Sequence, residues 1–227
     1  MRRSSTGYRH DPEPGAAHAT SVALGPPGQG RAAVPPARPG PQVAAQGRAM
    51  IIVGVDLSLQ STGIATIQNG PASGWMAKVE RITSEGHKTD TLQQRHTRLH
   101  NLRNAVCRRC EDADLILVEG PSYGSKGGHQ HDRSGLWWLV TDWLIAHPLV
   151  EVTPTQRMKY ATGKGQISKD AVLAAVVRRY PTVDVTGNDE ADALVLAAMG
   201  ARHLGEPIDD PMPKTHLAAM EAVAWPE

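Results

Sequence analysis

Residues 50–67 read MIIVGVDLSLQSTGIATI and join two apolar segments through a stretch that holds a single acid, Asp56. Residues 50–57 are almost continuously apolar, which is typical of a strand buried on both faces. Gly63–Ile67 predicts a second strand, and Asn69-Gly70 beyond it is a strong hairpin-turn signal. Asp56 therefore ends a central strand, where it either caps a loop amide or belongs to a site.

The chain beyond residue 70 continues with alternating strand and helix patterns. We expect strands at 75–82, 115–119 and 149–153, and a Gly- and His-rich loop at 120–133. We expect helices at 91–111, at 136–146, from Pro154, at 168–180 with Ser168 as its N-cap, and a last one that is capped by Asn188 or Asp189 and runs to 204. A three-strand meander followed by strand–helix units predicts an α/β fold, with a mixed five-stranded sheet flanked by helices. This order resembles that of the ribonuclease H-like fold.

Composition divides the chain into three parts. Residues 1–49 hold 8 of the 17 prolines and 7 of the 22 glycines, with no apolar run long enough for a core. We expect this part to be a disordered tail and no secretory signal, or else to lie upstream of a natural start at Met50. Residues 50–205 suit one domain, and the Pro- and acid-rich residues 206–227 predict a loosely ordered tail.

Charge and hydropathy narrow the function classes. Residues 50–227 carry 18 basic and 21 acidic residues, so any nucleic-acid binding must use a local basic patch. No apolar run approaches the length of a membrane span.

Cys107 and Cys110 form a lone C-x-x-C motif, and the nearby His96 and His100 share one predicted helix with them. Four ligands on one helix cannot surround a zinc ion, so we expect a buried Cys110 and a partly exposed Cys107 in a reducing cytosol.

Four acids form the main candidate site. Asp56 and Glu119 each follow a buried strand, and Asp189 and Asp192 share one face of the last helix at i, i+3 spacing. Acids in a first helical turn also favour the helix dipole, which explains Asp189 without function but not Asp192, which lies in an apolar run. Glu190 is expected to point away into solvent.

Clustered carboxylates repel one another, and a divalent cation resolves that conflict. Two Mg²⁺ ions, or Mn²⁺ as a substitute, hold the attacking water and leaving oxygen in phosphoryl chemistry. The expected metal ligands and catalytic residues are Asp56, Glu119, Asp189 and Asp192, with Asp56 bridging the ions.

Basic residues supply candidate DNA contacts. Lys159, Lys164 and Lys169 lie in a segment whose glycines, Gly163 and Gly165, let the backbone approach a phosphate; ordinary solvated lysines are the plainer alternative. The loop after Glu119 adds three more candidates, Tyr123, Lys126 and Arg133, which can contact or unstack DNA bases. A plain flexible loop is the alternative there, and His129 with His131 is a weak metal pair.

At these residues the chain resembles the RuvC-type Holliday junction resolvases. The matching segments occur in the family's order: Gly54–Gly63, Val118-Glu119, Pro154-Thr155 with Lys159, Gly163–Gly165 with Lys169, and Asp189–Leu194. The resemblance implies that the four acids bind metal and that Lys159 and Lys169 contact DNA or the reacting phosphate. It also implies a homodimer that places paired nicks across a four-way junction and leaves ligatable ends.

The loop after Glu119 departs from the family. Bacterial members carry an aromatic wedge three residues after the second acid, where this chain has Ser122 followed by Tyr123. Divergent members of this kind are common in phages, and the resemblance implies a bacterial or phage-infected host cytoplasm. The helix with Trp137, Trp138 and Trp143 carries more tryptophan than one face can bury, so part of it is expected to form the dimer interface.

Two other function classes remain open from the sequence. An actin-like-fold ATPase or sugar kinase also begins with a strand, an acid and a Ser/Thr-rich hairpin, but usually needs a Gly-rich adenosine motif and a second large domain. A non-catalytic junction-binding protein would keep the fold with a vestigial site. We expect instead a metal-dependent, structure-selective DNA endonuclease that acts on four-way or other branched junctions.

Overall fold

The computed structural model describes residues 49–70, 74–121, 129–209 and 211–226. Its strands are β1 Ile51–Asp56, β2 Ser61–Gly70, β3 Gly74–Thr83, β4 Leu115–Glu119 and β5 Leu149–Val152. They form one sheet in the order β3-β2-β1-β4-β5. β1, β2 and β3 make the antiparallel meander, whereas β4 runs parallel to β1 and β5 runs parallel to β4. The predicted mixed five-stranded sheet is confirmed.

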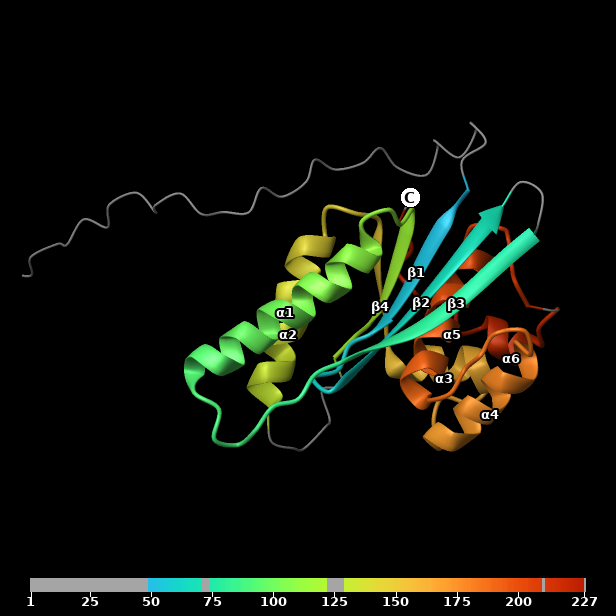
Figure 1. The fold of residues 1–227 in the computed structure, drawn as a ribbon. Helices are drawn as coiled ribbons and strands as arrows, with labels where there is room; N and C mark the ends of the chain where they lie inside the picture. The colour runs from blue at the N-terminus through green and yellow to red at the C-terminus, as the bar shows by residue number, and fades with distance from the viewer. Residues whose placement is uncertain (1–48, 71–73, 122–128, 210, 227) are drawn as a thin grey trace, which may run out of the picture. The chain divides into compact units, whose positions relative to one another are not determined.

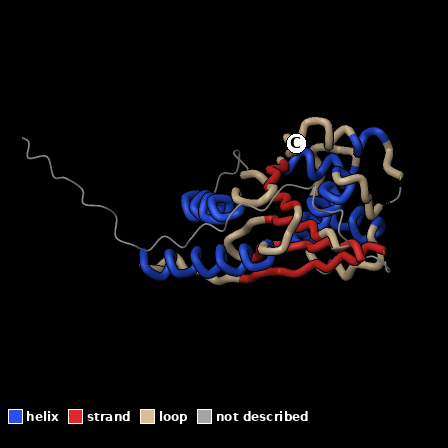
Figure 2. The backbone as a smooth tube through the Cα atoms, turned by 90° about the horizontal axis from the view of Figure 1, so that it is seen from above, coloured by secondary structure: helices blue, strands red, loops and turns tan. Residues whose placement is uncertain are grey.

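Helices cover both faces of this sheet (Figure 1). The helices are α1 Leu92–Cys110, α2 Gln130–Leu144, α3 Pro154–Thr162, α4 Lys169–Arg179, α5 Asn188–His203 and α6 Lys214–Leu217. α1 and α2 lie on one face, and α3, α4, α5 and α6 lie on the other; Figure 2 shows helices, in blue, on both sides of the red strands. Side chains of β1 alternate accordingly, since Val53 and Val55 enter the α1–α2 core and Ile52 enters the α5 core.

Local signals explain where the helices near the site begin. Thr153 accepts a hydrogen bond from the Gln156 backbone, Gln156 bonds back to the Thr153 backbone, and Pro154 takes the first position of α3. Ser168 caps α4 by accepting from the Ala171 backbone, as predicted. α5 begins at Asn188, but its N-cap is Gly187 without a side-chain bond, so neither Asn188 nor Asp189 has the capping role predicted for it.

Two further boundaries differ from the predictions. Asn69 and Gly70 lie inside β2, paired with Trp75 and Gly74, so the turn predicted at these two residues is wrong. Residues 71–73 lie outside the described residues. The longer cross-strand ladder outweighs the local Asn-Gly preference. α2 begins at Gln130 rather than residue 136, because polar residues of its first turn face solvent and interrupt the apolar pattern.

The described C-terminal residues pack against the domain, contrary to the predicted loose tail. Ala219 and Val223 are buried in the same core as α5, and Trp225 stacks on His203 with 4.2 Å between ring centroids. Asp209 accepts hydrogen bonds from two core tyrosine hydroxyls, at 3.0 Å from Tyr160 and 2.9 Å from Tyr180. These contacts join distant residues, so a local pattern of prolines and acids did not reveal them. Residues 1–48 of the predicted N-terminal tail lie outside the described residues.

Candidate active site

Two of the four candidate acids end adjacent parallel strands. β1 pairs with β4 in a register that sets Val55 beside Val118, so Asp56 and Glu119 follow at the same edge of the sheet. On the other side of β1, Asp56 is paired with Gly63 of β2. The predicted adjacency of Asp56 and Glu119 is therefore present in the fold.

The other two acids lie on α5, which packs very close to the sheet. A Cβ atom at Gly54 would lie 2.1 Å from the carbonyl oxygen of Ala193, and one at Gly63 would lie 2.0 Å from that of Asp189. Only glycine permits this approach. The first turn of α5 consequently lies against the ends of β1 and β2, which brings Asp189 and Asp192 to the strand-end acids.

The electrostatics of Asp56 show that the four acids interact. Its pKa is raised well above the usual value, first by burial and then by the negative charges of Glu119 and Asp192, with a smaller contribution from Asp189. Arg157 opposes these effects. Burial and repulsion from the neighbouring acids thus both disfavour the charged form of Asp56.

Asp192 lies deepest in the cluster, with only 4% of its surface exposed. Burial raises its pKa to about 6 despite the nearby guanidinium of Arg157. The charge of Lys169 also lowers the pKa of Asp192, so this lysine acts on the acid cluster from the first turn of α4.

Arg157 is the main residue that the sequence reasoning missed. It is 5% exposed, and its guanidinium donates from Nε to Glu119 Oε2 and from Nη1 to Asp192 Oδ1. The available signal was helical spacing, because the buried residues Arg157, Tyr160 and Ala161 share one face of α3. A cation on a buried face beside predicted acids indicates an ion pair.

The other residues predicted to contact DNA are placed as follows: none of those described makes a described contact with the four acids, apart from Lys169. Lys159 is half-buried on α3 and Lys164 is exposed, and among the described contacts neither is joined to the acids. Gly163 ends α3 in a left-handed conformation, with φ 77°, so helix termination accounts for this glycine. Arg133 is exposed in the first turn of α2, whereas Tyr123 and Lys126 lie outside the described residues.

Glu190 differs from the prediction, because it is buried rather than solvated. Its carboxylate accepts from the Thr186 backbone at 2.7 Å and the Thr186 hydroxyl at 2.8 Å. Arg81 of β3 pairs with it at 3.2 Å. These partners hold Glu190 apart from the four acids, in a structural contact between α5 and β3.

The described residues contain no preformed metal site. No three His, Cys, Asp or Glu side chains there, the four candidate acids included, are already placed to hold one ion. Cys107 and Cys110 are free and buried, which corrects the partly exposed Cys107. Burial raises the pKa of the Cys107 thiol to about 12 and also raises that of Cys110, so both are unreactive. None of the helices described is long and apolar enough to cross a bilayer.

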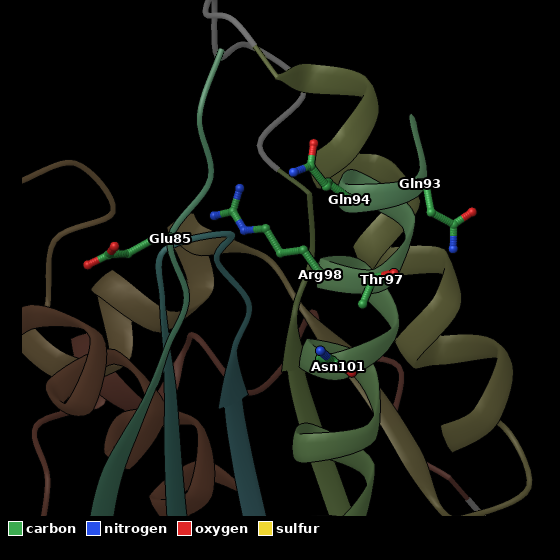
Figure 3. Close-up of a pocket in the computed structure, with 6 residues that line it drawn as sticks. All are labelled: Glu85, Gln93, Gln94, Thr97, Arg98 and Asn101. Carbon is green, nitrogen blue, oxygen red and sulfur yellow. The ribbon is translucent and has the colours of Figure 1, made fainter. Parts of the chain in front are cut away.

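A polar hollow of about 380 Å³ lies beside the start of α1 (Figure 3). Its lining consists of Glu85, Gln93, Gln94, Thr97, Arg98 and Asn101, and includes none of the four acids. Arg98 donates from Nε to the Ser84 hydroxyl at 2.8 Å and from Nη2 to the Leu59 carbonyl. It thereby ties α1 to the turn that follows Asp56.

Comparison with known proteins gives structural matches alone. No protein-family model matches the sequence, and no curated protein matches it. The structure of RuvC from Thermus thermophilus aligns at 16% identity with a TM-score of 0.53, covering 72% of this chain and 100% of that one. T. thermophilus RuvC in complex with Holliday junction substrate aligns at 13% identity with a TM-score of 0.51, covering 72% and 99%. Given the shared sheet and helices, this chain has the RuvC-type, ribonuclease H-like fold.

Proposed function

We propose that this chain is a Mg²⁺-dependent endonuclease that cuts four-way or other branched DNA junctions. The observation that carries the proposal is the convergence of Asp56, Glu119, Asp189 and Asp192 at one edge of the sheet. The fold supports it, and one of the similar structures is a RuvC in complex with Holliday junction substrate.

The residues at this edge fit a hard divalent cation. All four donors are carboxylates, which Mg²⁺ and Mn²⁺ prefer, and burial together with repulsion from the other acids raises the pKa of Asp56. Two ions bound there would activate the attacking water and stabilise the leaving oxygen. Asp56 is the candidate bridging ligand, because the charges of all three other acids act on it.

The protein's own cations supply the substrate contacts in this proposal. Lys169 is exposed and acts electrostatically on Asp192, so it can hold a phosphate beside the acids. Arg133 lies in the first turn of α2, the helix whose Trp137 donates to the Glu119 carbonyl. Lys159, Lys164, Tyr123 and Lys126 remain predicted DNA contacts.

The direct test is cleavage of a labelled synthetic four-way junction. We expect paired nicks in the presence of Mg²⁺ or Mn²⁺, no product in EDTA, and much less cleavage of a linear duplex of the same sequence. Ends that a DNA ligase can reseal would match the expected chemistry. Equal cleavage of the linear duplex would remove the junction selectivity and leave a general nuclease.

The same samples distinguish the two alternative functions. Tight junction binding in both EDTA and Mg²⁺, with no product at any protein ratio, would identify a non-catalytic binder. ATP hydrolysis without nuclease activity would favour the actin-like ATPase or kinase. Either result would contradict the proposed endonuclease.

We further propose that the nuclease works as a homodimer formed through α2. Trp137 donates from its indole to the Glu119 carbonyl at 3.1 Å and is half-buried. Trp138 and Ile145 are 67% and 71% exposed, and their i, i+7 spacing places them on one face of the helix. Burial of such a pair between two copies removes an exposed apolar face.

Substitution of Trp138 by Arg is expected to shift the protein to a monomer at micromolar concentration, because a charge replaces the apolar contact. Sedimentation velocity on wild type and W138R measures this, with Val177→Arg as the matched control because Val177 is an exposed residue on α4. A wild-type monomer at the same concentration would contradict the dimer.

A further inference from the structure

A buried arginine occupies the centre of the acid cluster. The Arg157 side chain is 6% exposed, and it pairs with Glu119 of β4 and Asp192 of α5 at the same time. Its charge also acts on Asp56 of β1. One guanidinium therefore interacts with three of the four proposed metal ligands, which lie on β4, α5 and β1.

The position of Arg157 is fixed by the helix that carries it. Its place in α3 is set by the Thr153–Gln156 capping box and by Tyr160 and Ala161, which are buried on the same face. A guanidinium keeps its charge in proteins and offers a planar fork of donors to carboxylates. Arg157 thus neutralises part of the negative charge of the cluster.

The same contacts oppose a metal ion. The bonded atoms, Glu119 Oε2 and Asp192 Oδ1, are oxygens that the proposed ions would use. A guanidinium and a divalent cation repel each other at such short range. Among the described residues, no three acidic, histidine or cysteine side chains are placed to hold a metal ion, and the Arg157 pairs occupy two of the oxygens that such a site would use.

We propose that Arg157 is a resident counter-cation that a divalent ion must displace, so that this residue sets the metal affinity of the site. The inference rests on the proposed metal-dependent function. In the metal-free protein Arg157 holds β4, α3 and α5 together; with metal bound, it gives up Glu119 and Asp192. Arg157 is a positioning residue in this account, since it acts through the acids.

The test is Mn²⁺ binding by the full chain, measured from the electron paramagnetic resonance signal of free Mn²⁺. Arg157→Met removes the charge but keeps an unbranched side chain, and is expected to bind Mn²⁺ at least about tenfold more tightly than wild type. Arg157→Lys keeps the charge but lacks the planar fork of donors, so its Mn²⁺ affinity is expected to lie between those of wild type and R157M. Arg81→Met is the matched control, because Arg81 pairs with Glu190 on the same helix outside the cluster, and its affinity should equal that of wild type.

A direct readout of displacement comes from the arginine side chain itself. The Nε–H of Arg157 donates to Glu119, so it should give a protected ¹⁵Nε signal in EDTA that is missing in R157K. Addition of Mg²⁺ is expected to remove the protection of this signal. A signal that stays protected at saturating Mg²⁺ would overturn displacement without use of any variant.

The variants separate failure of this inference from failure of the proposed function. If Asp56→Asn abolishes Mn²⁺ binding but R157M and R157K bind no more tightly than wild type, the role of Arg157 is wrong and the metal site stands. If Asp56→Asn and Asp192→Asn leave Mn²⁺ binding unchanged, the ions bind elsewhere. The proposed metal site and the metal-dependent function are then both wrong. Circular dichroism of each variant in EDTA excludes unfolding as the cause.

Discussion

Replacement of Asp56 by Asn is expected to reduce cleavage of a four-way junction by about a thousandfold or more. Asp56 ends the central strand, between Glu119 on β4 and the first turn of α5. As the candidate bridging ligand it would contribute several kcal/mol of transition-state stabilisation, and each 1.36 kcal/mol is about tenfold in rate. The amide keeps the shape of the side chain and removes the charge that holds the ions.

The measurement is the single-turnover rate with saturating protein and Mg²⁺, so that weaker DNA binding does not limit the result. Glu190→Gln is the matched control, because Glu190 is a buried acid on α5 whose partners are Thr186 and Arg81. We expect its cleavage rate to stay near wild type. A D56N protein that cuts as fast as E190Q would show that the acids have been assigned to the wrong role.

Replacement of Asp192 by Asn is expected to stabilise the metal-free protein at neutral pH. Burial raises the Asp192 pKa from its ordinary value of 3.8 to about 6, so between these values the folded state binds more protons than the unfolded state. Stability from this group is therefore complete below the unfolded pKa and is lost as pH rises through about 6. Asn keeps the uncharged form at every pH, and the gain at pH 7.5 is on the order of 3 kcal/mol.

Urea unfolding in EDTA at pH 7.5 and pH 5 measures this effect. Wild type should gain stability on going to pH 5 through this group, whereas D192N should lose that part of the pH dependence. The E190Q protein should be less stable to urea than wild type, since the substitution weakens the pair with Arg81 and the hydrogen bonds from Thr186. A D192N protein less stable than wild type at pH 7.5 would mean that the pair with Arg157 outweighs the cost of burying the charge.

Much of this fold was predictable because the decisive signals are local. The apolar runs ending in Asp56 and Glu119 identified β1 and β4, and the Ala-rich segment after Asn188 identified α5. Strand-end position and i, i+3 spacing were enough to bring the four acids to one edge. The same reasoning was wrong where a contact between distant residues decides the outcome, as with Glu190 and the C-terminal residues around Asp209.

Arg157 shows most clearly what a local reading omits. Helical spacing places Arg157 on one face with Tyr160 and Ala161, but arginine in a short helix is ordinarily solvent-exposed. The pairing of Arg157 with β4 and α5 is visible only in the tertiary structure. The exposure of Cys107 was wrongly predicted for the same reason, since only the tertiary structure shows that its side chain is 4% exposed. Burial of a polar residue depends on which elements meet, and that requires the tertiary structure.

The burial of α5 has a consequence for how the site opens. Every residue from Glu190 to Ala201 is buried, and such segments exchange their amide hydrogens only when a whole domain unfolds. Arg157 instead belongs to the nine-residue α3, in which only Arg157, Tyr160 and Ala161 are buried. Hydrogen exchange should therefore be slow in α5, which carries Asp192, and faster in α3, which carries Arg157, so that local opening of α3 can free Glu119 and Asp192 while α5 stays in place.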